Sequence, residues 1–431
     1  MKPNKKKNRQ KAKKPAPNFS LEELTEAAGV AFANQELDTA LALYSSALDV
    51  QSKLLEASEL SRRNEVIDQR VSLLEKRAEA KTAIGDPDGA REDYQEALNL
   101  HKSTESLQSD PSWYERSASL HLYIGQTSSG KEAIAAYEEA LSILGTCIEQ
   151  CQKMSDKNAI EEITRQLAGV CCNAAEVYLT DLCEEPDAEG QCEKWVQKAL
   201  SYQISSSDTP GKTQPTVDAL QLLANLRISQ CRAPEAIAPI LEAFEQIQTP
   251  CHSLAQLVDI DPNCQDDMEM QDRAKELTHV DAVQALPGFE FRCQMAKIML
   301  EAAAVSDTAD EAARESCRQA AITVLGSLMA ENDEVIEVWA LLGDAHAAIG
   351  SKEEASSYWQ SALEMLGHLK RSIEDDMQME NSMDDEDPGA DEREDEMQQQ
   401  LEDVMCQMED LQRKTSEIEP SASNEVEPMQ E

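Results

Sequence analysis

Aromatic residues make up only 4% of this 431-residue chain, and runs of β-branched residues are hard to find. Sheets are usually rich in those two classes of residue. Ala, Leu, Glu and Gln recur instead, and these residues favour helices. No stretch is apolar enough to cross a bilayer. The composition therefore predicts an all-α protein with no role in a membrane.

Basic residues are also scarce, because 39 Lys+Arg face 83 Asp+Glu and the formal net charge is −44. A charge of that size repels nucleic acid phosphates and anionic lipid, and it attracts basic ligands. We expect a basic protein partner and no direct contact with nucleic acid.

The twelve cysteines form no CxxC motif, and the chain has only six histidines. Cys147 and Cys151 could share a helix face, but small buried residues explain them better than metal ligands do. Unpaired cysteines and the lack of a signal peptide favour a reduced protein of the cytoplasm and nucleus. The sequence contains no Gly-rich phosphate loop, no G-x-S-x-G and no H-E-x-x-H. We expect no metal, no cofactor and no catalysis.

Charge divides the chain into three zones. Residues 1–18 form a basic arm, expected to be disordered, and residues 373–431 an acidic tail that is mostly disordered for want of apolar residues. Within the tail, the apolar spacing over 392–414 fits an amphipathic helix. The arm fits a nuclear-import signal that an import receptor would read, or else an arm that touches RNA or the chain's own acidic tail. The residues of this signal are Lys5, Lys6, Lys7, Arg9, Lys11, Lys13 and Lys14.

The middle zone, residues 19–372, carries a repeat signal that is clearest near its end. A tetratricopeptide repeat is a helix pair of about 34 residues with large and small residues at fixed positions. Trp339, Gly343, Ala355, Trp359 and Ala362 occupy the fourth, eighth, twentieth, twenty-fourth and twenty-seventh positions. Small residues there let two helices cross closely, and large ones fill the groove toward the next repeat.

Six weaker matches keep similar offsets along the chain. The third match needs three extra residues in the 127–130 turn, and the fourth needs a longer loop over 184–190. We predict an all-α tetratricopeptide-repeat superhelical solenoid of about six to seven helix pairs, with a loop over 201–215 and an insertion over 249–288. The six matches are Ala28, Ala40, Tyr44 and Ala47; Ala78, Ala90, Tyr94 and Ala97; Ala118, Ala133, Tyr137 and Ala140; Ala175, Cys192, Val196 and Ala199; Ala224, Ala236, Ile240 and Ala243; and Ala296 with Cys317.

In such solenoids the first helix of each pair lines the concave face through its second, fifth, ninth, twelfth and thirteenth positions. These positions hold one base, Lys297, and many acids, which predicts a groove for a segment rich in Lys and Arg. The alternative is that an acidic protein carries acids on every face. A clamp for the acidic tails of heat-shock chaperones is disfavoured, because it needs the opposite charge. The acids are Glu22, Glu75, Glu79, Glu115, Glu176, Asp218, Glu290, Glu301, Glu337 and Asp344.

Two stretches, Leu286–Arg292 and Glu334–Leu366, together with the repeat over 28–47 and the acidic end, carry a resemblance to a known family. The chain resembles the assembly chaperones of large ribosomal subunit protein number four. This resemblance implies a tetratricopeptide solenoid that captures the new ribosomal protein, holds its long basic loop in the groove and escorts it to the nucleus. The groove acids would then bind the client. The basic N-terminal arm departs from the family's usual picture.

We therefore take a dedicated, monomeric chaperone for a ribosomal protein with a Lys/Arg-rich extension as the leading hypothesis. The alternatives are a scaffold that assembles a multiprotein complex through helix-in-groove contacts, and a histone-type chaperone that uses mainly the acidic tail.

Overall fold

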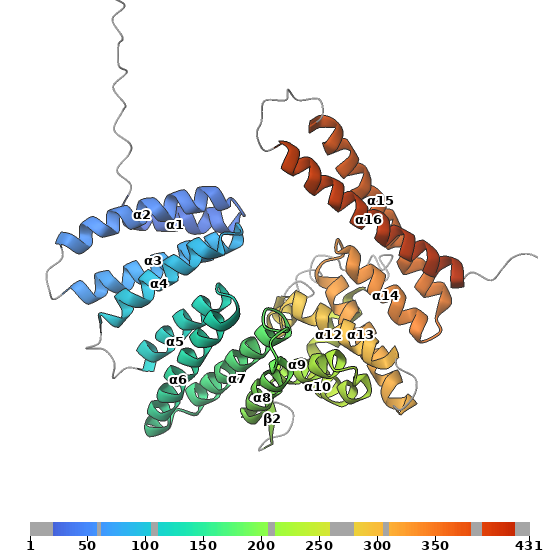
Figure 1. Ribbon diagram of the computed structural model, residues 1–431, viewed down its shortest axis with the longest axis horizontal. Helices are drawn as coiled ribbons and strands as arrows, with labels where there is room; N and C mark the ends of the chain where they lie inside the picture. Colours follow the sequence, from blue (N-terminus) through green and yellow to red (C-terminus); the bar gives the residue numbers. More distant parts are fainter. Residues whose placement is uncertain are drawn as a thin grey trace, which may run out of the picture. The chain divides into compact units, whose positions relative to one another are not determined.

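The computed structural model describes residues 20–57, 62–104, 111–205, 212–258, 280–304, 310–380 and 390–418, almost all of them in α-helices (Figure 1). Consecutive helices pack as hairpins, so the predicted all-α solenoid is confirmed. The chain divides into two compact units, Met1–Ile204 and Ser205–Glu431. The basic arm over 1–18 lies outside the described residues.

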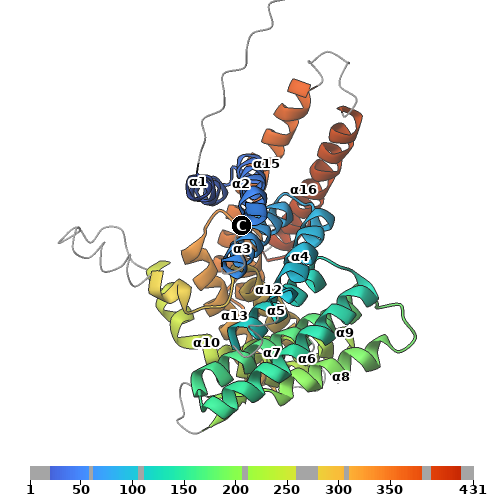
Figure 2. The ribbon, with the colours of Figure 1, turned by 90° about the vertical axis from the view of Figure 1, so that its left-hand side faces the viewer.

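The described part of the first unit consists of four helix hairpins. In Figure 2 the helices α1 and α2 are seen nearly end-on, whereas α7 and α8 run across the view, so the hairpins rotate along this unit. The hairpins are α1 (Leu21–Ala33) with α2 (Leu37–Ala57), α3 (Arg63–Ala83) with α4 (Pro87–Lys102), α5 (Pro111–Gln126) with α6 (Gly130–Met154), and α7 (Lys157–Leu179) with α8 (Ala188–Ser201).

The second unit contains three further hairpins and a closing helix among its described residues. Before its first helix, the strand β2 (Thr213–Pro215) pairs with β1 (Gln203–Ser205), so part of the predicted 201–215 loop is a small β-ribbon. The helices are α9 (Val217–Ser229), the 3-10 helix η2 (Ala233–Ala236), α10 (Ile237–Val258), α12 (Phe289–Ala304), α13 (Glu311–Glu331), α14 (Ile336–Ala348), α15 (Lys352–Glu380) and α16 (Ala390–Ile418).

Several hairpins join their two helices by a three-residue turn, and these turns share one backbone conformation. The middle residue of the turn is left-handed at Gln35, Gly85, Cys231 and Gly350. Glycine adopts this conformation without strain, which suits Gly85 and Gly350, where φ is +87° and +85°. In the fourth hairpin a longer connection, residues 180–187, separates α7 from α8.

The third hairpin differs from the predicted alignment. Its turn, residues 127–129, is no longer than the others, so it holds no extra residues. The extra residues belong to α5, and His121 therefore precedes Ala133 by the same twelve residues that separate Ala28 from Ala40. Ala118 is still buried, one turn earlier in the helix.

Small side chains lie where the two helices of a hairpin cross. In several hairpins one buried aromatic ring packs beside them. Ala28, Ala78, Ala355 and Ala362 are completely buried, and Tyr44, Tyr94, Tyr137 and Trp359 are at most 4% exposed. Both residues of the weakest sequence match, Ala296 and Cys317, are also fully buried. Trp339 differs because it is half-buried, and its indole N–H donates to the Asp333 carbonyl at 2.7 Å.

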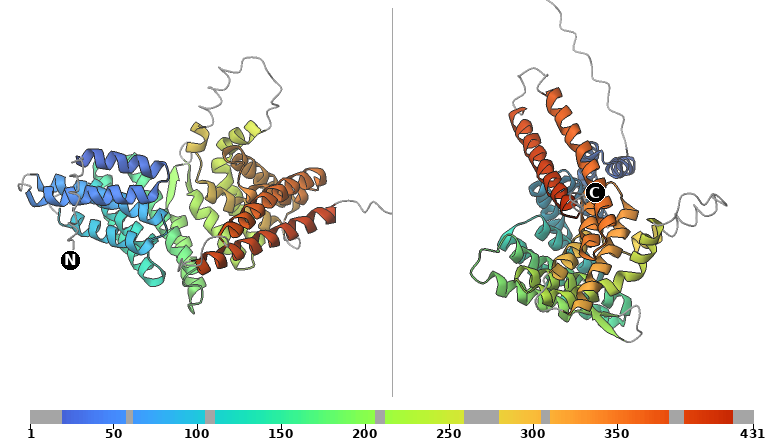
Figure 3. Two further views of the ribbon diagram at one scale, coloured as in Figure 1. Left: turned by 90° about the horizontal axis from the view of Figure 1, so that it is seen from above. Right: turned by 90° about the vertical axis from the view of Figure 1, so that its right-hand side faces the viewer.

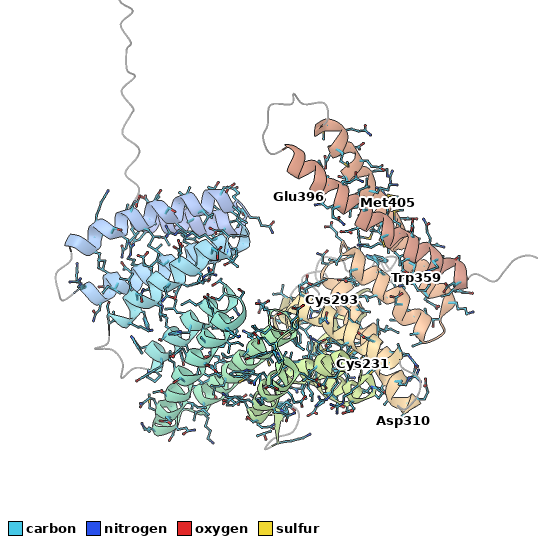
Figure 4. All side chains as sticks on the ribbon, in the orientation of Figure 1. Cys231, Cys293, Asp310, Trp359, Glu396 and Met405 are labelled. Atoms are coloured by element: carbon cyan, nitrogen blue, oxygen red, sulfur yellow. The ribbon has the colours of Figure 1, made fainter. Side chains whose placement is uncertain are left out.

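Gly343 shows why the crossing needs small residues. It lies in α14 against the indole of Trp359, which is labelled on α15 in Figure 4. A Cβ atom at Gly343 would lie only 2.2 Å from two atoms of that ring. The eighth position of this repeat therefore has no room for a side chain.

Two predicted boundaries differ from the structure. The helix α10 continues through Pro250 to Val258, so the first ten residues of the expected 249–288 insertion are helical, and most of the remainder lies outside the described residues. Much of the acidic tail is also helical: α15 extends to Glu380, and α16 contains the predicted 392–414 helix. Figure 3 shows α15 and α16 side by side.

A buried arginine fixes the start of α12 in the second unit. Arg292 is 1% exposed, and its guanidinium donates to the Pro287 carbonyl at 2.9 Å, to Ser327 Oγ at 3.1 Å and to the Glu331 carboxylate. Removing one member of a buried ion pair leaves the other charge without compensation. The Leu286–Arg292 stretch thus joins α12 to α13.

We expect Gly343→Ala to destabilise the second unit. Overpacking a tight core costs about 1–3 kcal/mol, which exceeds the gain of about 1 kcal/mol in helix propensity. Gly367→Ala in α15 is the matched control, because nothing lies within 4 Å of a Cβ there. In thermal unfolding the first variant should melt below the parent chain and the second at or above it.

We also expect Arg292→Met to lower the free energy of unfolding by about 3–5 kcal/mol. Arg232→Met is its control, since the Arg232–Glu235 pair is exposed and such pairs contribute about 1 kcal/mol or less. Urea denaturation followed by circular dichroism measures both. Equal losses in the two variants would contradict the structural role given to Arg292.

Candidate functional site

The candidate binding surface is, within each unit, the face of the first helices: the predicted positions on α1, α3, α5 and α7 in the first unit, and on α9, α12 and α14 in the second. Four of its ten acids lie in the first turn of their helices. A carboxylate there is stabilised by the partial positive charge of the helix N-terminus, so local helix formation alone accounts for these four acids. They are Glu22, Asp218, Glu290 and Glu337.

A hollow of about 530 Å³ separates α1 from α3 on this face in the first unit. Glu22, Thr25 and Gly29 line it from α1, at the second, fifth and ninth positions of the first repeat. Lys76 borders it from α3, so the hollow is less purely acidic than the sequence positions indicated.

A base already neutralises Glu75. Arg116 on α5 donates its Nε to Glu75 Oε1 at 3.1 Å and its Nη2 to Oε2 at 2.6 Å, and it also pairs with Asp68. Both oxygens of Glu75 are therefore engaged. The pair joins the first helices of two neighbouring repeats.

Glu79 lies one helical turn beyond Glu75, and no ion pair or hydrogen bond to its side chain occurs within the described ranges. Burial raises the pKa of Glu79, the like charge of Glu75 adds to this, and Lys76 opposes it. Burial likewise raises the pKa of Tyr44, Tyr94 and Tyr123, and the Glu79 carboxylate contributes to each shift. Glu79 is thus an exposed carboxylate without an ion pair in the described part of the chain.

In the second unit, bases hold two of the predicted acids. Lys297 Nζ lies 2.7 Å from Glu337 Oε1. Lys414 of α16 donates to both oxygens of Asp344, at 2.9 and 3.1 Å, and the Trp359 indole donates to the same carboxylate at 3.1 Å. The chain's own tail helix therefore occupies Asp344.

The remaining predicted acids differ in their surroundings. Asp218, Glu290 and Glu301 are exposed, while Glu115 and Glu176 take part in interactions of their own. No result tests which of the ten acids bind a partner, so that role stays a prediction.

Sequence reasoning missed three bases and one phenol near this face: Lys76, Arg116, Lys414 and Tyr123. Arg116 and Lys76 lie on the first helices but outside the positions that were counted. The corrected alignment of α5 places Arg116 next to Glu115 at the second position. Lys414 could not be found by repeat position, because α16 lies outside the repeats.

The described ranges contain no group of three or more metal-ligating side chains. None of their helices combines the length and apolarity required to span a bilayer. Cys147 and Cys151 are buried on α6. Burial is the main cause that raises the pKa of Cys147 to about 12, and the neighbouring Cys151 thiol adds to it. A thiol of that pKa is a packing residue and a poor nucleophile.

No family model matches the chain. A curated relative, the "Probable assembly chaperone of rpl4" of Schizosaccharomyces pombe, is 24% identical over 266 residues, which is 62% of this chain and 60% of that protein. The resemblance found in the sequence is confirmed. This chain spans about 60% of the length of that relative.

Solved structures of repeat proteins are also similar. Residues 1–338 of an Assembly Chaperone of RpL4 (Acl4) are 23% identical, with a TM-score of 0.44 and coverage of 79% of this chain and 100% of that chain. A tetratricopeptide-repeat protein of Thermus thermophilus is 16% identical, with a TM-score of 0.26 and coverage of 62% and 100%.

We expect Lys414→Glu to loosen α16, because it replaces two ion pairs with like charges beside Asp344 and Asp410. Amide hydrogen exchange over 400–418 should quicken about tenfold, which corresponds to about 1.4 kcal/mol. Arg413→Glu is the control, because Arg413 is 60% exposed and its pairs lie within α16. Unchanged exchange in the first variant would show that apolar contacts alone hold α16.

Proposed function

We propose that this chain is a non-catalytic chaperone that holds a basic segment of a newly made ribosomal protein, large-subunit protein number four, and delivers it for ribosome assembly. The similarity to the curated relative over 266 residues carries the proposal, because charge alone does not select a ribosomal client. The mode of binding is argued from the first-helix face. We further propose that the chain acts as a monomer in the cytoplasm and nucleus, where an import receptor reads its basic arm.

Charge supplies the mechanism of capture. Basic ribosomal extensions bind RNA through their Lys and Arg side chains, and this binding is electrostatic. An acidic face accelerates encounter with such a segment and covers its charges until ribosomal RNA competes for them. The acids that serve in this role are those without a base of their own, which here include Glu22, Glu79, Glu290 and Glu301.

The structure changes the experiment that tests the alternative in which the acidic tail itself binds the client. Deleting residues 374–431 would remove α16, whose Val404 and Leu411 belong to one buried apolar cluster with Ile373 and Leu366. Such a deletion would expose apolar surface as well as remove charge. Neutralising the exposed acids Glu402, Asp403 and Glu409 leaves that packing in place.

We expect a variant in which Glu22, Glu79, Glu290 and Glu301 are all replaced by Lys to bind the client at least about a hundredfold more weakly. The control reverses four exposed acids of the second helices, Asp38, Glu92, Glu138 and Glu364, with the same change in net charge. Affinity for the purified ribosomal protein is measured by isothermal titration calorimetry, and circular dichroism checks folding.

Three outcomes separate the hypotheses. Loss of capture only in the first variant supports the face proposed here, and equal loss in both supports a general effect of net charge. If both variants bind normally and only Glu402→Gln with Asp403→Asn and Glu409→Gln fails, the tail is the chaperone. A tagged chain that co-purifies with many unrelated proteins would favour the scaffold.

A further inference from the structure

The second helix of its own repeat holds the carboxylate of Asp344 in place. Asp344 occupies the ninth position of the repeat in α14, one of the positions that line the first-helix face of the second unit. The indole of Trp359, which is 3% exposed, donates from Nε1 to Asp344 Oδ1 at 3.1 Å. This donor orients the carboxylate without neutralising its charge, because an indole N–H is a neutral group. Asp344 is therefore a fixed acceptor for an ammonium or guanidinium group.

Lys414 of α16 supplies the cation for Asp344. Its Nζ lies 2.9 and 3.1 Å from the two oxygens of Asp344, and 3.1 Å from Oδ2 of Asp410, one turn earlier in α16. The side chains of Lys414 and Asp344 are 28% and 34% exposed, so water reaches the pair. Only a deeply buried pair leaves a costly charge behind when one partner departs. Another cation can thus replace Lys414 at modest cost.

A lysine is unusual in this part of the chain. Residues 374–431 contain 22 acids and three bases, of which Lys414 is one. Lys414 lies three residues after Leu411 and four before Ile418, and both of these belong to the apolar cluster between α15 and α16. Residues at that spacing share one side of a helix. The acidic tail thus turns one of its few bases toward an acid of the first-helix face.

Few buried side chains hold α16. Among the side chains described in this helix, only Val404 and Leu411 are buried, whereas α13 buries nine. Segments with few buried apolar contacts open most readily. A terminal helix also caps a solenoid, but the apolar side of α16 serves that purpose without an ion pair to the first-helix face. The cap alone does not explain why Lys414 binds Asp344.

We propose that Lys414 is an internal competitor of the client. It occupies Asp344 in the free chain and gives way to a lysine or arginine side chain of the basic segment. This inference rests on the proposed function, in which such a segment lies along the first-helix face, and it adds regulation of that face. Client binding and the Lys414–Asp344 pair exclude each other, so each client must first outcompete the chain's own base.

The test compares the affinity of full-length variants for the purified ribosomal protein by isothermal titration calorimetry. Lys414→Gln removes the competitor and should tighten binding about fivefold. Arg413→Gln is the matched control, because it removes the same charge from the next residue, whose ion pairs lie within α16. It should change the affinity less than about twofold. In an Asp344→Asn chain, Lys414→Gln should bring no gain, because the acid for which it competes is gone.

Amide hydrogen exchange on the unaltered chain gives a second measurement that depends on no variant. Binding of the ribosomal protein should quicken exchange over 400–418 about tenfold, because the displaced Lys414 no longer ties α16 to α14. Equal affinities of Lys414→Gln and Arg413→Gln, or slower exchange over 400–418 in the complex, would overturn the competitor and leave the acidic face intact. If the unaltered chain did not bind the ribosomal protein, the proposed function itself would fail.

Discussion

Close approach of paired helices is the constraint on which the rest of this fold depends. Each hairpin places small residues at its crossing, and at Gly343 even a methyl group would collide with Trp359. Once the crossing is that tight, the orientation of both helices about their axes is fixed. The side chains that line the first-helix face then follow from the repeat position alone. Within each unit, acids at the second and ninth positions of successive repeats consequently lie on the same side of the first helices.

Sharing a surface does not make those acids equivalent. Helix N-termini account for Glu22, Asp218, Glu290 and Glu337, and internal bases already hold Glu75 and Asp344. Pairs such as Glu75–Arg116 join neighbouring repeats, so their charges serve the solenoid before they serve a partner. Net charge therefore overstates the capacity of this face for a basic ligand, and neither explanation covers Glu79 or Glu301.

Repeat positions predicted the fold well because burial of a small residue every few positions is a local pattern. Ala28, Ala78 and Ala355 could be placed from spacing alone. Spacing could not distinguish a longer turn from a longer helix in the third hairpin, since both preserve the distance from Ala118 to Ala133. It could not show that Lys414 reaches Asp344, because that contact joins residues far apart in sequence. Partners of a charged side chain depend on tertiary packing, which a repeat register does not contain.

In the proposed function, neutralisation inside the chain sets which basic segments the first-helix face can bind. A smooth acidic surface would attract any cationic segment at long range, with little preference for where its charges fall. Here Arg116, Lys297 and Lys414 neutralise particular carboxylates and leave others exposed. A basic segment must then match the positions that remain, and long-range attraction gives way to a spacing requirement at short range. On that proposal, discrimination among basic partners follows from the positions of the chain's own bases more than from the net charge of −44.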